Sequence, residues 1–361
     1  MKKKYVLLVP NLNGGGAEKV ILTLFKEIQK YDSNIEVYLI TVNKVGSLVK
    51  QLPENSNLID LGIDRIRRAP RPLIKVLNEI RPDTILSTLT GMNLLLLMIR
   101  PFLKGSPKIV VRETNPPSSK FRSTKIKLLY RIFYRFADKI IGISEGVSSD
   151  VTEYAAISKE KVVTIYNPID IKDIRTKAQH YTGNDWLDKK DTLVILAIGR
   201  LVEQKDFTTL IKAFAKLRQT LDCKLVILGE GPEKDSLLQL TYELNVNKYV
   251  LFQGFVDNPY AYLEKSDLFV LSSKWEGFGL VIAEALATKT PIVSTNCMGA
   301  PAEILEYGRY GELVEPGDFL GMSEAMHNMI INPYKNEELL FKRANDFNVN
   351  HITKQYLQVL E

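Results

Sequence analysis

The 361-residue sequence has few cysteines and no long apolar run. Its two cysteines, Cys223 and Cys297, cannot form a disulfide framework, and they indicate a reducing compartment. The apolar stretch near the N-terminus covers five residues before a run of glycines. It is too short for a signal peptide, so we interpret it as a first strand. The longest run elsewhere, LLLLMI at 94–99, is far too short to span a bilayer.

Positive charge is concentrated in the first half of the chain. Residues 1–168 contain 27 Lys and Arg against 15 Asp and Glu, a net charge of +12, whereas the remaining residues carry a net charge of −6. This asymmetry predicts an anionic partner for the first half. Nucleic acid, anionic lipid and a phosphorylated substrate are the candidate partners. No nucleic-acid recognition module is visible in the sequence.

Short apolar segments alternate with longer mixed segments in both halves. Continuous apolar strands separated by helices indicate parallel sheets covered on both faces, and two such sets predict two doubly wound α/β domains. The boundary is expected within 166–174, where YNPIDIKDI contains a proline and lacks periodicity. The expected strands are 5–10, 36–42, 84–89, 108–113 and 139–144 in the first half and 193–200, 224–230, 249–254, 268–273 and 291–296 in the second.

A run of three glycines follows the first expected strand, in NLNGGGAEKV. Gly14, Gly15 and Gly16 let the backbone approach a ligand, and the start of the following helix favours negative charge. The spacing differs from a dinucleotide-binding fingerprint, because Lys19 occupies the position of its third glycine. The segment is either a tight turn or a ligand loop, and three consecutive glycines favour the ligand loop.

Two cations follow the first expected strand of the second half, in AIGRLVEQKDF. Arg200 and Lys205 are five positions apart. Two cations beyond a parallel strand suit a diphosphate, which arginine holds through two parallel hydrogen bonds and lysine as a point charge. The alternative is that both are solvated surface charges.

Two glutamates eight positions apart lie in the segment WEGFGLVIAEALA. Glu276 precedes Gly277 and Gly279, whose backbone can direct N–H groups at a ligand where a helix begins. Glu284 lies inside the apolar helix, where a carboxylate needs a partner because burying it unpaired is costly. That partner is either a sugar or ribose diol, or a lysine or arginine in a structural ion pair.

Together these motifs resemble the retaining glycosyltransferases of family 4, which have the GT-B fold. The family carries two glutamates separated by seven residues, as Glu276 and Glu284 are here. It also carries a Gly-Arg followed by a lysine five positions after the arginine, as at Arg200 and Lys205, and a glycine-rich loop after the first strand. The resemblance covers nearly the whole chain, and the motifs keep their order.

The resemblance implies an architecture and a division into domains. Two Rossmann-like doubly wound α/β domains would face a central cleft. Residues 1–167 would form the acceptor-side domain, and a C-terminal helix at 345–361 would cross back onto it. Residues 168–344 would bind the donor nucleotide.

The resemblance also implies which residues form the site. Glu276 would bind hydroxyls of the donor sugar, and Glu284 would bind the ribose. Arg200 and Lys205 would hold the diphosphate. The residues whose backbone would assist in donor binding are Gly15, Gly16, Gly277, Phe278, Gly279 and Leu280.

The chemistry of the leaving group sets a further expectation. The sequence contains no Asp-x-Asp motif, so we expect no metal site and no cofactor beyond the nucleotide diphosphate sugar, which is a co-substrate. Cations and helix N-termini would stabilise the leaving group where water is excluded. No carboxylate is obviously placed as a nucleophile, unlike the two-carboxylate scheme of glycosidases. We therefore expect substitution on one face of the sugar, with retention of configuration.

One position departs from the family pattern. Many relatives have a histidine after the strand that ends here in VVRETNPP, and this sequence has Glu113, Thr114 and Asn115 there. None of its three histidines lies near an expected strand end of the first domain. The role of that histidine in acceptor activation or sugar contact is therefore unassigned.

A basic segment with an apolar face covers 120–139, in KFRSTKIKLLYRIFYRFADK. Such a helix is typical of a membrane surface, although an amphipathic helix packed on its own sheet gives the same pattern. With the positive first half, it favours a lipid-linked acceptor that carries phosphate. The residues expected on the acceptor or membrane side are Lys120, Arg122, Lys125, Lys127 and Arg131.

The expected protein is a retaining hexosyltransferase. It would move a hexose or N-acetylhexosamine from a UDP-linked sugar to a growing polyprenyl-pyrophosphate-linked glycan, in bacterial surface polysaccharide or glycoprotein synthesis. It would be cytoplasmic, associated with the anionic inner face of the cell membrane, and would bind no nucleic acid. The alternatives are a GT-B enzyme with a soluble acceptor, a phosphorylase or epimerase of this fold, and a nucleotide-sugar-binding protein without catalysis. The intact Glu276, Arg200 and Lys205 argue against the last of these.

Overall fold

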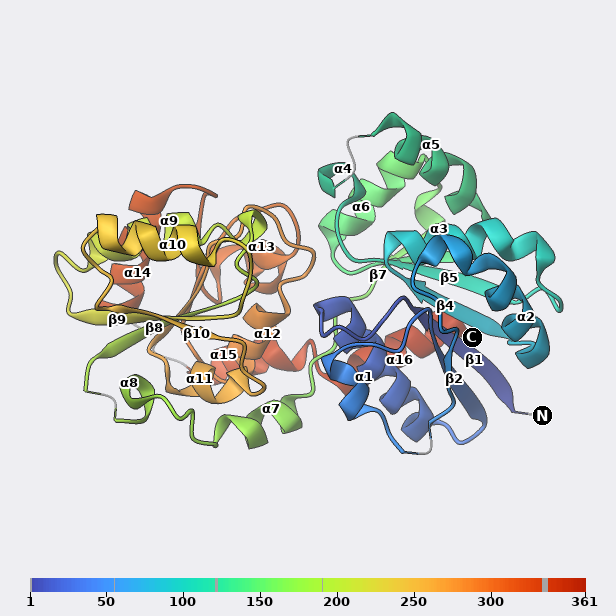
Figure 1. Ribbon diagram of the computed structural model, residues 1–361, viewed down its shortest axis with the longest axis horizontal. Helices are drawn as coiled ribbons and strands as arrows, with labels where there is room; N and C mark the ends of the chain where they lie inside the picture. Colours follow the sequence, from blue (N-terminus) through green and yellow to red (C-terminus); the bar gives the residue numbers. More distant parts are fainter. Residues whose placement is uncertain (1, 55, 121–122, 190, 333–336) are drawn as a thin grey trace. The chain divides into compact units, whose positions relative to one another are not determined.

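The chain folds into two compact units, each with one parallel sheet and helices on both faces (Figure 1). Unit 1 consists of Met1–Pro168 and Val349–Glu361, and unit 2 of Ile169–Asn348. These two sheets confirm the two doubly wound α/β domains predicted from the sequence. The computed structural model describes residues 2–54, 56–120, 123–189, 191–332 and 337–361.

The sheet of unit 1 has seven parallel strands in the order β3-β2-β1-β4-β5-β6-β7. Its central strands are continuous apolar runs, as expected where both faces are covered. The strands are β1 (Lys3–Val9), β2 (Ile35–Thr41), β3 (Leu58–Asp60), β4 (Thr84–Thr88), β5 (Lys108–Glu113), β6 (Lys139–Gly142) and β7 (Val162–Thr164).

Helices cover the two faces of this sheet differently. The helices α1 and α16 pack together on one face, and α2, α3, α5 and α6 contribute to the apolar core on the other. The α-helices are α1 (Gly16–Tyr31), α2 (Pro70–Ile80), α3 (Thr90–Ile99), α4 (Pro117–Lys120), α5 (Thr124–Phe133), α6 (Glu145–Ala155) and α16 (Val349–Leu360). The short 3-10 helices are η1 (Ser47–Gln51), η2 (Ile66–Arg68), η3 (Arg100–Phe102), η4 (Tyr134–Phe136) and η5 (Lys159–Lys161).

A fully buried arginine ties the last helix to the sheet of unit 1. The Arg112 guanidinium donates to the Tyr356 hydroxyl of α16 at 2.9 Å, to the Thr88 hydroxyl at 2.9 Å, and to the Asn167 side-chain oxygen. Burying a cation is costly unless its N–H groups have hydrogen-bond acceptors, so these three hydrogen bonds are needed to keep Arg112 in place. Arg112 thus fixes both α16 and the end of the first chain segment of unit 1.

The sheet of unit 2 has six parallel strands in the order β10-β9-β8-β11-β12-β13. The strands are β8 (Leu193–Ile198), β9 (Cys223–Leu228), β10 (Val250–Gly254), β11 (Leu268–Leu271), β12 (Ile292–Thr295) and β13 (Glu312–Val314). One face packs against α9, α10 and α14. The helices α7, α11, α12 and α15 pack against one another on the other side (Figure 1).

The α-helices of unit 2 are mostly short. They are α7 (Ile171–Ala178), α8 (Asp185–Asp188), α9 (Phe207–Leu217), α10 (Lys234–Glu243), α11 (Pro259–Lys265), α12 (Leu280–Ala287), α13 (Pro301–Ile304), α14 (Phe319–Ile331) and α15 (Glu337–Asn345). Two 3-10 helices, η6 (Glu203–Lys205) and η7 (Glu306–Gly308), lie in loops.

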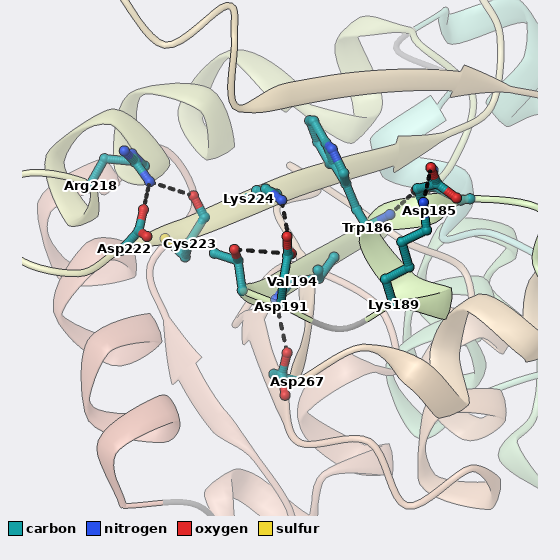
Figure 2. A network of polar contacts seen from close by, with 12 residues as sticks. Asp185, Trp186, Lys189, Asp191, Val194, Arg218, Asp222, Cys223, Lys224 and Asp267 are labelled. Carbon is teal, nitrogen blue, oxygen red and sulfur yellow. Dashed lines mark hydrogen bonds and ion pairs between the residues drawn. The ribbon is translucent and has the colours of Figure 1, made fainter.

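Charged side chains near the amino ends of the unit 2 strands form ion pairs or hydrogen bonds with neighbouring groups (Figure 2). Lys224 Nζ pairs with Asp191 Oδ1 at 3.1 Å and lies 5.2 Å from the centre of the Trp186 ring. The Val194 N–H donates to Asp267 Oδ2 at 2.8 Å. This amino edge is therefore held by its own residues, and the sequence motifs lie at the opposite, carboxyl edge.

The apolar run 94–99 lies in α3, where Leu96 and Leu97 are buried in the unit 1 core. Among the described residues, no helix combines the length and hydropathy that crossing a bilayer requires.

Candidate active site

Two loops meet at the carboxyl edge of the unit 2 sheet, because β8 and β11 are neighbouring strands. Ser272, after β11, donates through Oγ to the carbonyl of Lys205, after β8, at 2.7 Å. The Lys274 N–H donates to the Gln204 carbonyl at 2.8 Å, and the Gln204 side-chain amide donates to the Trp275 carbonyl at 2.9 Å. These hydrogen bonds hold the two loops side by side.

Lys205 and Glu276 form an ion pair where the loops meet. Lys205 Nζ contacts Glu276 Oε1, and Ser273 Oγ donates to the same oxygen at 2.6 Å. The side chains are 18% and 8% exposed, so each charge depends on the other. No described residue donates to Glu276 Oε2, so this oxygen can still accept hydrogen bonds from a ligand hydroxyl.

The loop after β12 contacts the backbone of Glu276. The Glu276 N–H donates to the Met298 carbonyl at 2.9 Å. Gly299 has φ +131°, and a Cβ there would lie 2.0 Å from the Glu276 carbonyl oxygen, so only glycine fits. Burial and then the negative charge of Glu276 raise the pKa of the Cys297 thiol to about 12. Cys297 is therefore a neutral thiol beside the ion pair.

Arg200 differs from Lys205 in having an exposed side chain. Within the part of the chain that the structure describes, its guanidinium makes no hydrogen bond or ion pair. Its loop is nevertheless fixed, because the Leu201 N–H donates to the Glu230 carbonyl at 2.9 Å. Gly231 also packs closely there, since a Cβ would lie 2.3 Å from the Leu201 carbonyl oxygen. The fixed loop thus presents a cation that can bind an anion.

Glu284 lies in α12 and is 6% exposed. The Tyr260 hydroxyl donates to Glu284 Oε1 at 3.4 Å, so Glu284 and Glu276 contact different groups. The helix begins after Gly279, whose left-handed conformation (φ +80°) redirects the chain at that point. Phe278 is buried and packs edge-on against Phe347, with ring centres 5.6 Å apart. Leu280 is the first residue of α12.

The remaining predicted donor residues belong to unit 1. Gly15 and Gly16 are exposed where α1 begins, with Gly15 as its N-cap residue. The adjacent Gly14 has φ +97°, which favours glycine. Glu18 supplies negative charge in the first turn of this helix.

Three of the five predicted acceptor-side cations are exposed on α5, namely Lys125, Lys127 and Arg131. Lys120 is the last residue of α4, and Arg122 lies outside the described residues. The helix also exposes Leu128 and Ile132.

Sequence reasoning did not predict the polar contacts at the end of β5. Glu113 is 2% exposed and accepts hydrogen bonds from α3 and α5, whereas Thr114 and Asn115 are half-buried. The sequence signal was the pair of charged residues, Arg112 and Glu113, that follows the apolar residues 109–111 at the end of β5.

Comparison with known proteins assigns the chain to a family. Residues 184–346 match the family described as Glycosyl transferases group 1, and residues 14–173 match Glycosyltransferase Family 4. Over 382 aligned positions, covering 99% of each chain, the protein is 31% identical to a Campylobacter jejuni enzyme. That relative is named N-acetylgalactosamine-N,N'-diacetylbacillosaminyl-diphospho-undecaprenol 4-alpha-N-acetylgalactosaminyltransferase.

The chain belongs to glycosyltransferase family 4. Solved structures agree on the fold of this glycosyltransferase. Anabaena HepE in complex with UDP and glucose superposes with a TM-score of 0.81 at 20% identity, covering 99% of both chains. The lipopolysaccharide outer core galactosyltransferase WaaB superposes with a TM-score of 0.77 at 19% identity, covering 98% of both chains. The GT-B fold predicted from the sequence is confirmed.

Proposed function

We propose that this glycosyltransferase transfers a hexose or N-acetylhexosamine from a UDP-linked sugar to a polyprenyl-diphosphate-linked glycan, with retention of configuration and without a metal ion. The observation that carries the proposal is the carboxyl edge of unit 2. There the exposed Arg200 and the Lys205–Glu276 pair follow neighbouring strands. The names of the relatives supply the substrate classes, a diphospho-undecaprenol glycan and UDP.

The chemistry needs stabilisation of a diphosphate leaving group. The bond between the anomeric carbon and the diphosphate oxygen breaks, while the acceptor oxygen bonds to the same face of that carbon. The departing oxygen takes the proton of the acceptor hydroxyl. Arg200 and Lys205 offset the negative charge that develops, and a fixed cation does this without reorganising in the transition state.

Glu276 has the role of a sugar-binding group. Its Oε1 already accepts from Ser273 and contacts Lys205, so the carboxylate is held in place. Its Oε2 can then accept from donor hydroxyls. Glu284, deeper in α12, accepts from the ribose hydroxyls of the nucleotide.

Incubation with a panel of UDP, GDP and ADP sugars tests the donor assignment. We expect slow hydrolysis of a UDP sugar alone and faster transfer when a polyprenyl-diphosphate-linked glycan is present. Nuclear magnetic resonance of the product should show the anomeric configuration of the donor. An inverted product, or binding of nucleotide sugars without turnover on any acceptor, contradicts the proposal.

We further propose that α5 rests on the anionic membrane that carries the acceptor. Leu128 and Ile132 are 57% and 42% exposed on this helix, among the exposed cations Lys125, Lys127 and Arg131. Apolar side chains that enter the interface, flanked by cations that attract anionic headgroups, fit a lipid surface.

Reversing the three α5 cations to glutamate tests this surface. The triple variant Lys125→Glu/Lys127→Glu/Arg131→Glu should lose binding to vesicles that contain phosphatidylglycerol, and wild-type binding should weaken with salt. Hydrolysis of the donor alone should stay unchanged, because the donor residues of unit 2 are untouched. Equal vesicle binding by both proteins contradicts a membrane role for α5.

A further inference from the structure

The carboxylate of Glu113 is the centre of a buried polar network in unit 1. Asn93 Nδ2 donates to its Oε1 at 2.9 Å, and the Tyr134 hydroxyl donates to the same oxygen. The Tyr130 hydroxyl lies 3.3 Å from its Oε2. We call these four residues, Asn93, Glu113, Tyr130 and Tyr134, the tyrosine–glutamate network. Glu113 is 2% exposed, and the other three are fully buried.

The network joins three elements at the carboxyl edge of the unit 1 sheet. Glu113 is the last residue of β5, Asn93 lies in the first turn of α3, and Tyr130 lies in α5. Tyr134 begins η4, directly after α5. The strand face that carries Glu113 also carries Val111, which belongs to the same apolar core as both tyrosines. Glu113 is therefore a polar anchor at the rim of that core.

The two tyrosines hold α5 in one orientation. They are four residues apart, so they lie on the same face of the helix turn, and their rings stack with centres 4.2 Å apart. The single Tyr130 proton has two acceptors within reach, Glu113 Oε2 at 3.3 Å and the Thr90 hydroxyl oxygen at 3.0 Å. Hydrogen bonds from two hydroxyls to one carboxylate are charge-assisted and directional.

Both hydroxyls remain protonated donors at all working pH values. Burial, and then the charge of Glu113, raise the pKa of Tyr130 and of Tyr134 well above the ordinary value for tyrosine. The carboxylate in turn needs these donors, because a buried carboxylate that loses them has no water to replace them.

Glu113 also begins the loop at which the family pattern places a histidine. The chain continues through Thr114 and Asn115 into α4, where the Ser118 N–H donates to Asp150 Oδ2 at 3.0 Å. One residue therefore fixes both the start of this loop and the inner face of α5. The outer face of α5 is the surface that exposes Leu128 and Ile132.

We propose that Glu113 is a positioning residue that sets α5 against the end of β5, so that a lipid-linked acceptor reaches the 114–116 loop in a fixed register. This inference rests on the proposed transfer to a lipid-linked glycan. Glu113 acts through the two tyrosines and touches no substrate. The tyrosine–glutamate network therefore links the outer face of α5, the proposed lipid-facing surface, to the 114–116 loop.

Tyr134→Phe in the full-length enzyme tests the proposal, because it removes one donor and keeps the ring. Rates are measured against polyprenyl-diphosphate-linked glycan in phosphatidylglycerol vesicles, with saturating UDP sugar. We expect the acceptor KM to rise severalfold, up to about tenfold, because losing one charge-assisted hydrogen bond shifts α5 away from the position that the acceptor needs. Hydrolysis of the donor alone should change less than twofold. Glu113→Gln replaces a carboxylate that three donors face with an amide whose nitrogen cannot accept a hydrogen bond. It should therefore raise the acceptor KM further.

Tyr5→Phe is the matched control. Tyr5 is also a buried tyrosine of unit 1, it is 1% exposed, and its hydroxyl has no hydrogen-bond partner among the described residues. Its acceptor KM should equal that of wild type. A merely structural role for Tyr134 would lower the melting temperature and the maximal rate without changing KM, since KM does not depend on the amount of folded enzyme.

The outcomes separate this proposal from the proposed function. If wild type transfers sugar to the lipid-linked glycan and Tyr134→Phe has the acceptor KM of Tyr5→Phe, the positioning role is wrong and the function stands. If wild type transfers no sugar to that acceptor, the proposed function itself fails, and the positioning role fails with it. If Glu113→Gln does not fold, the acceptor KM of Tyr134→Phe, compared with that of Tyr5→Phe, alone tests the positioning role.

Discussion

The Lys205–Glu276 ion pair allows the structural and catalytic roles of one lysine to be separated. We predict that Lys205→Met lowers the free energy of unfolding by about 3 kcal/mol, because it leaves a carboxylate that is 8% exposed without its cation. In the double variant Lys205→Met/Glu276→Gln neither charge remains. Its loss of stability should therefore be smaller than the sum of the two single losses, by about 1–3 kcal/mol.

Turnover should respond differently from stability. In the proposed mechanism Lys205 offsets charge that develops on the leaving diphosphate, so its loss should lower kcat by about 100- to 1000-fold. The double variant also lacks the proposed sugar-binding carboxylate of Glu276, so its kcat does not test Lys205, and Lys205→Met alone is compared with wild type. A lysine with only a structural role would leave the kcat per folded molecule near that of wild type.

Lys224→Met is the matched control for Lys205→Met. The Lys224 side chain is also 18% exposed and paired, but its partner Asp191 is 68% exposed and the pair lies at the amino edge of the sheet (Figure 2). Because solvent screens such a pair, the variant should lose less than about 1 kcal/mol. Its kcat should stay within twofold of wild type.

Tryptophan fluorescence during urea unfolding is the assay for stability. The two tryptophans of the chain, Trp186 and Trp275, both lie in unit 2, so the signal reports the unit that contains the ion pair. Initial rates of transfer give kcat. Strictly additive losses of stability would show that the two charges do not stabilise each other. A kcat of Lys205→Met equal to that of Lys224→Met would exclude Lys205 from catalysis.

Two further predictions concern buried groups of unit 2. Glu284→Gln keeps the size of the side chain and removes its charge, so the KM for the UDP sugar should rise about tenfold with little change in acceptor KM, as steady-state kinetics will show; an unchanged donor KM contradicts ribose binding. Burial raises the pKa of Cys223 and Cys297 to about 12, so only about one thiol in 10⁴ is ionised at pH 8. Iodoacetamide at pH 8 should label neither cysteine in the native enzyme and both in urea, as mass spectrometry will show; rapid native labelling contradicts the buried thiols.

The strands show how far the sequence specifies this fold. All ten strands expected from apolar runs are present. Nine of them lie inside a sheet and are largely buried, whereas β10 is an edge strand whose residues are mostly half-buried. The three that the sequence did not predict are β3, β7 and β13, each of three residues. All three lie at sheet edges, where one side lacks a neighbouring strand and apolar residues are not required.

Less of the candidate site than of the fold could be predicted from the sequence. The spacing of Arg200 and Lys205 suggests two equivalent cations, yet Lys205 turns to Glu276 while Arg200 faces solvent. That difference depends on the alignment of β8 with β11, which brings together loops 71 residues apart in the chain. Local spacing carries no information about such an alignment.

The tyrosine–glutamate network shows the same limit in unit 1. The basic segment at 120–139 predicts a helix with an apolar face, and α5 forms only Thr124–Phe133 of it. The 3-10 helix η4 and the start of β6 follow. The apolar face expected from the sequence consists of Leu128, Leu129, Ile132, Phe133 and Phe136. It does not include Tyr130 and Tyr134, although each directs a hydroxyl at Glu113. Periodicity cannot show which tyrosines are hydrogen-bond donors.

The proposed mechanism requires protein cations, rather than a metal ion, to hold the diphosphate of a UDP sugar at the carboxyl edge of unit 2. The most direct measurement compares wild type and Arg200→Ala in transfer of sugar to a polyprenyl-diphosphate-linked glycan with EDTA present. We expect full wild-type kcat in EDTA and a kcat about 100- to 1000-fold lower for Arg200→Ala. Loss of wild-type transfer in EDTA that Mg²⁺ or Mn²⁺ restores, or equal rates for the two proteins, would contradict it.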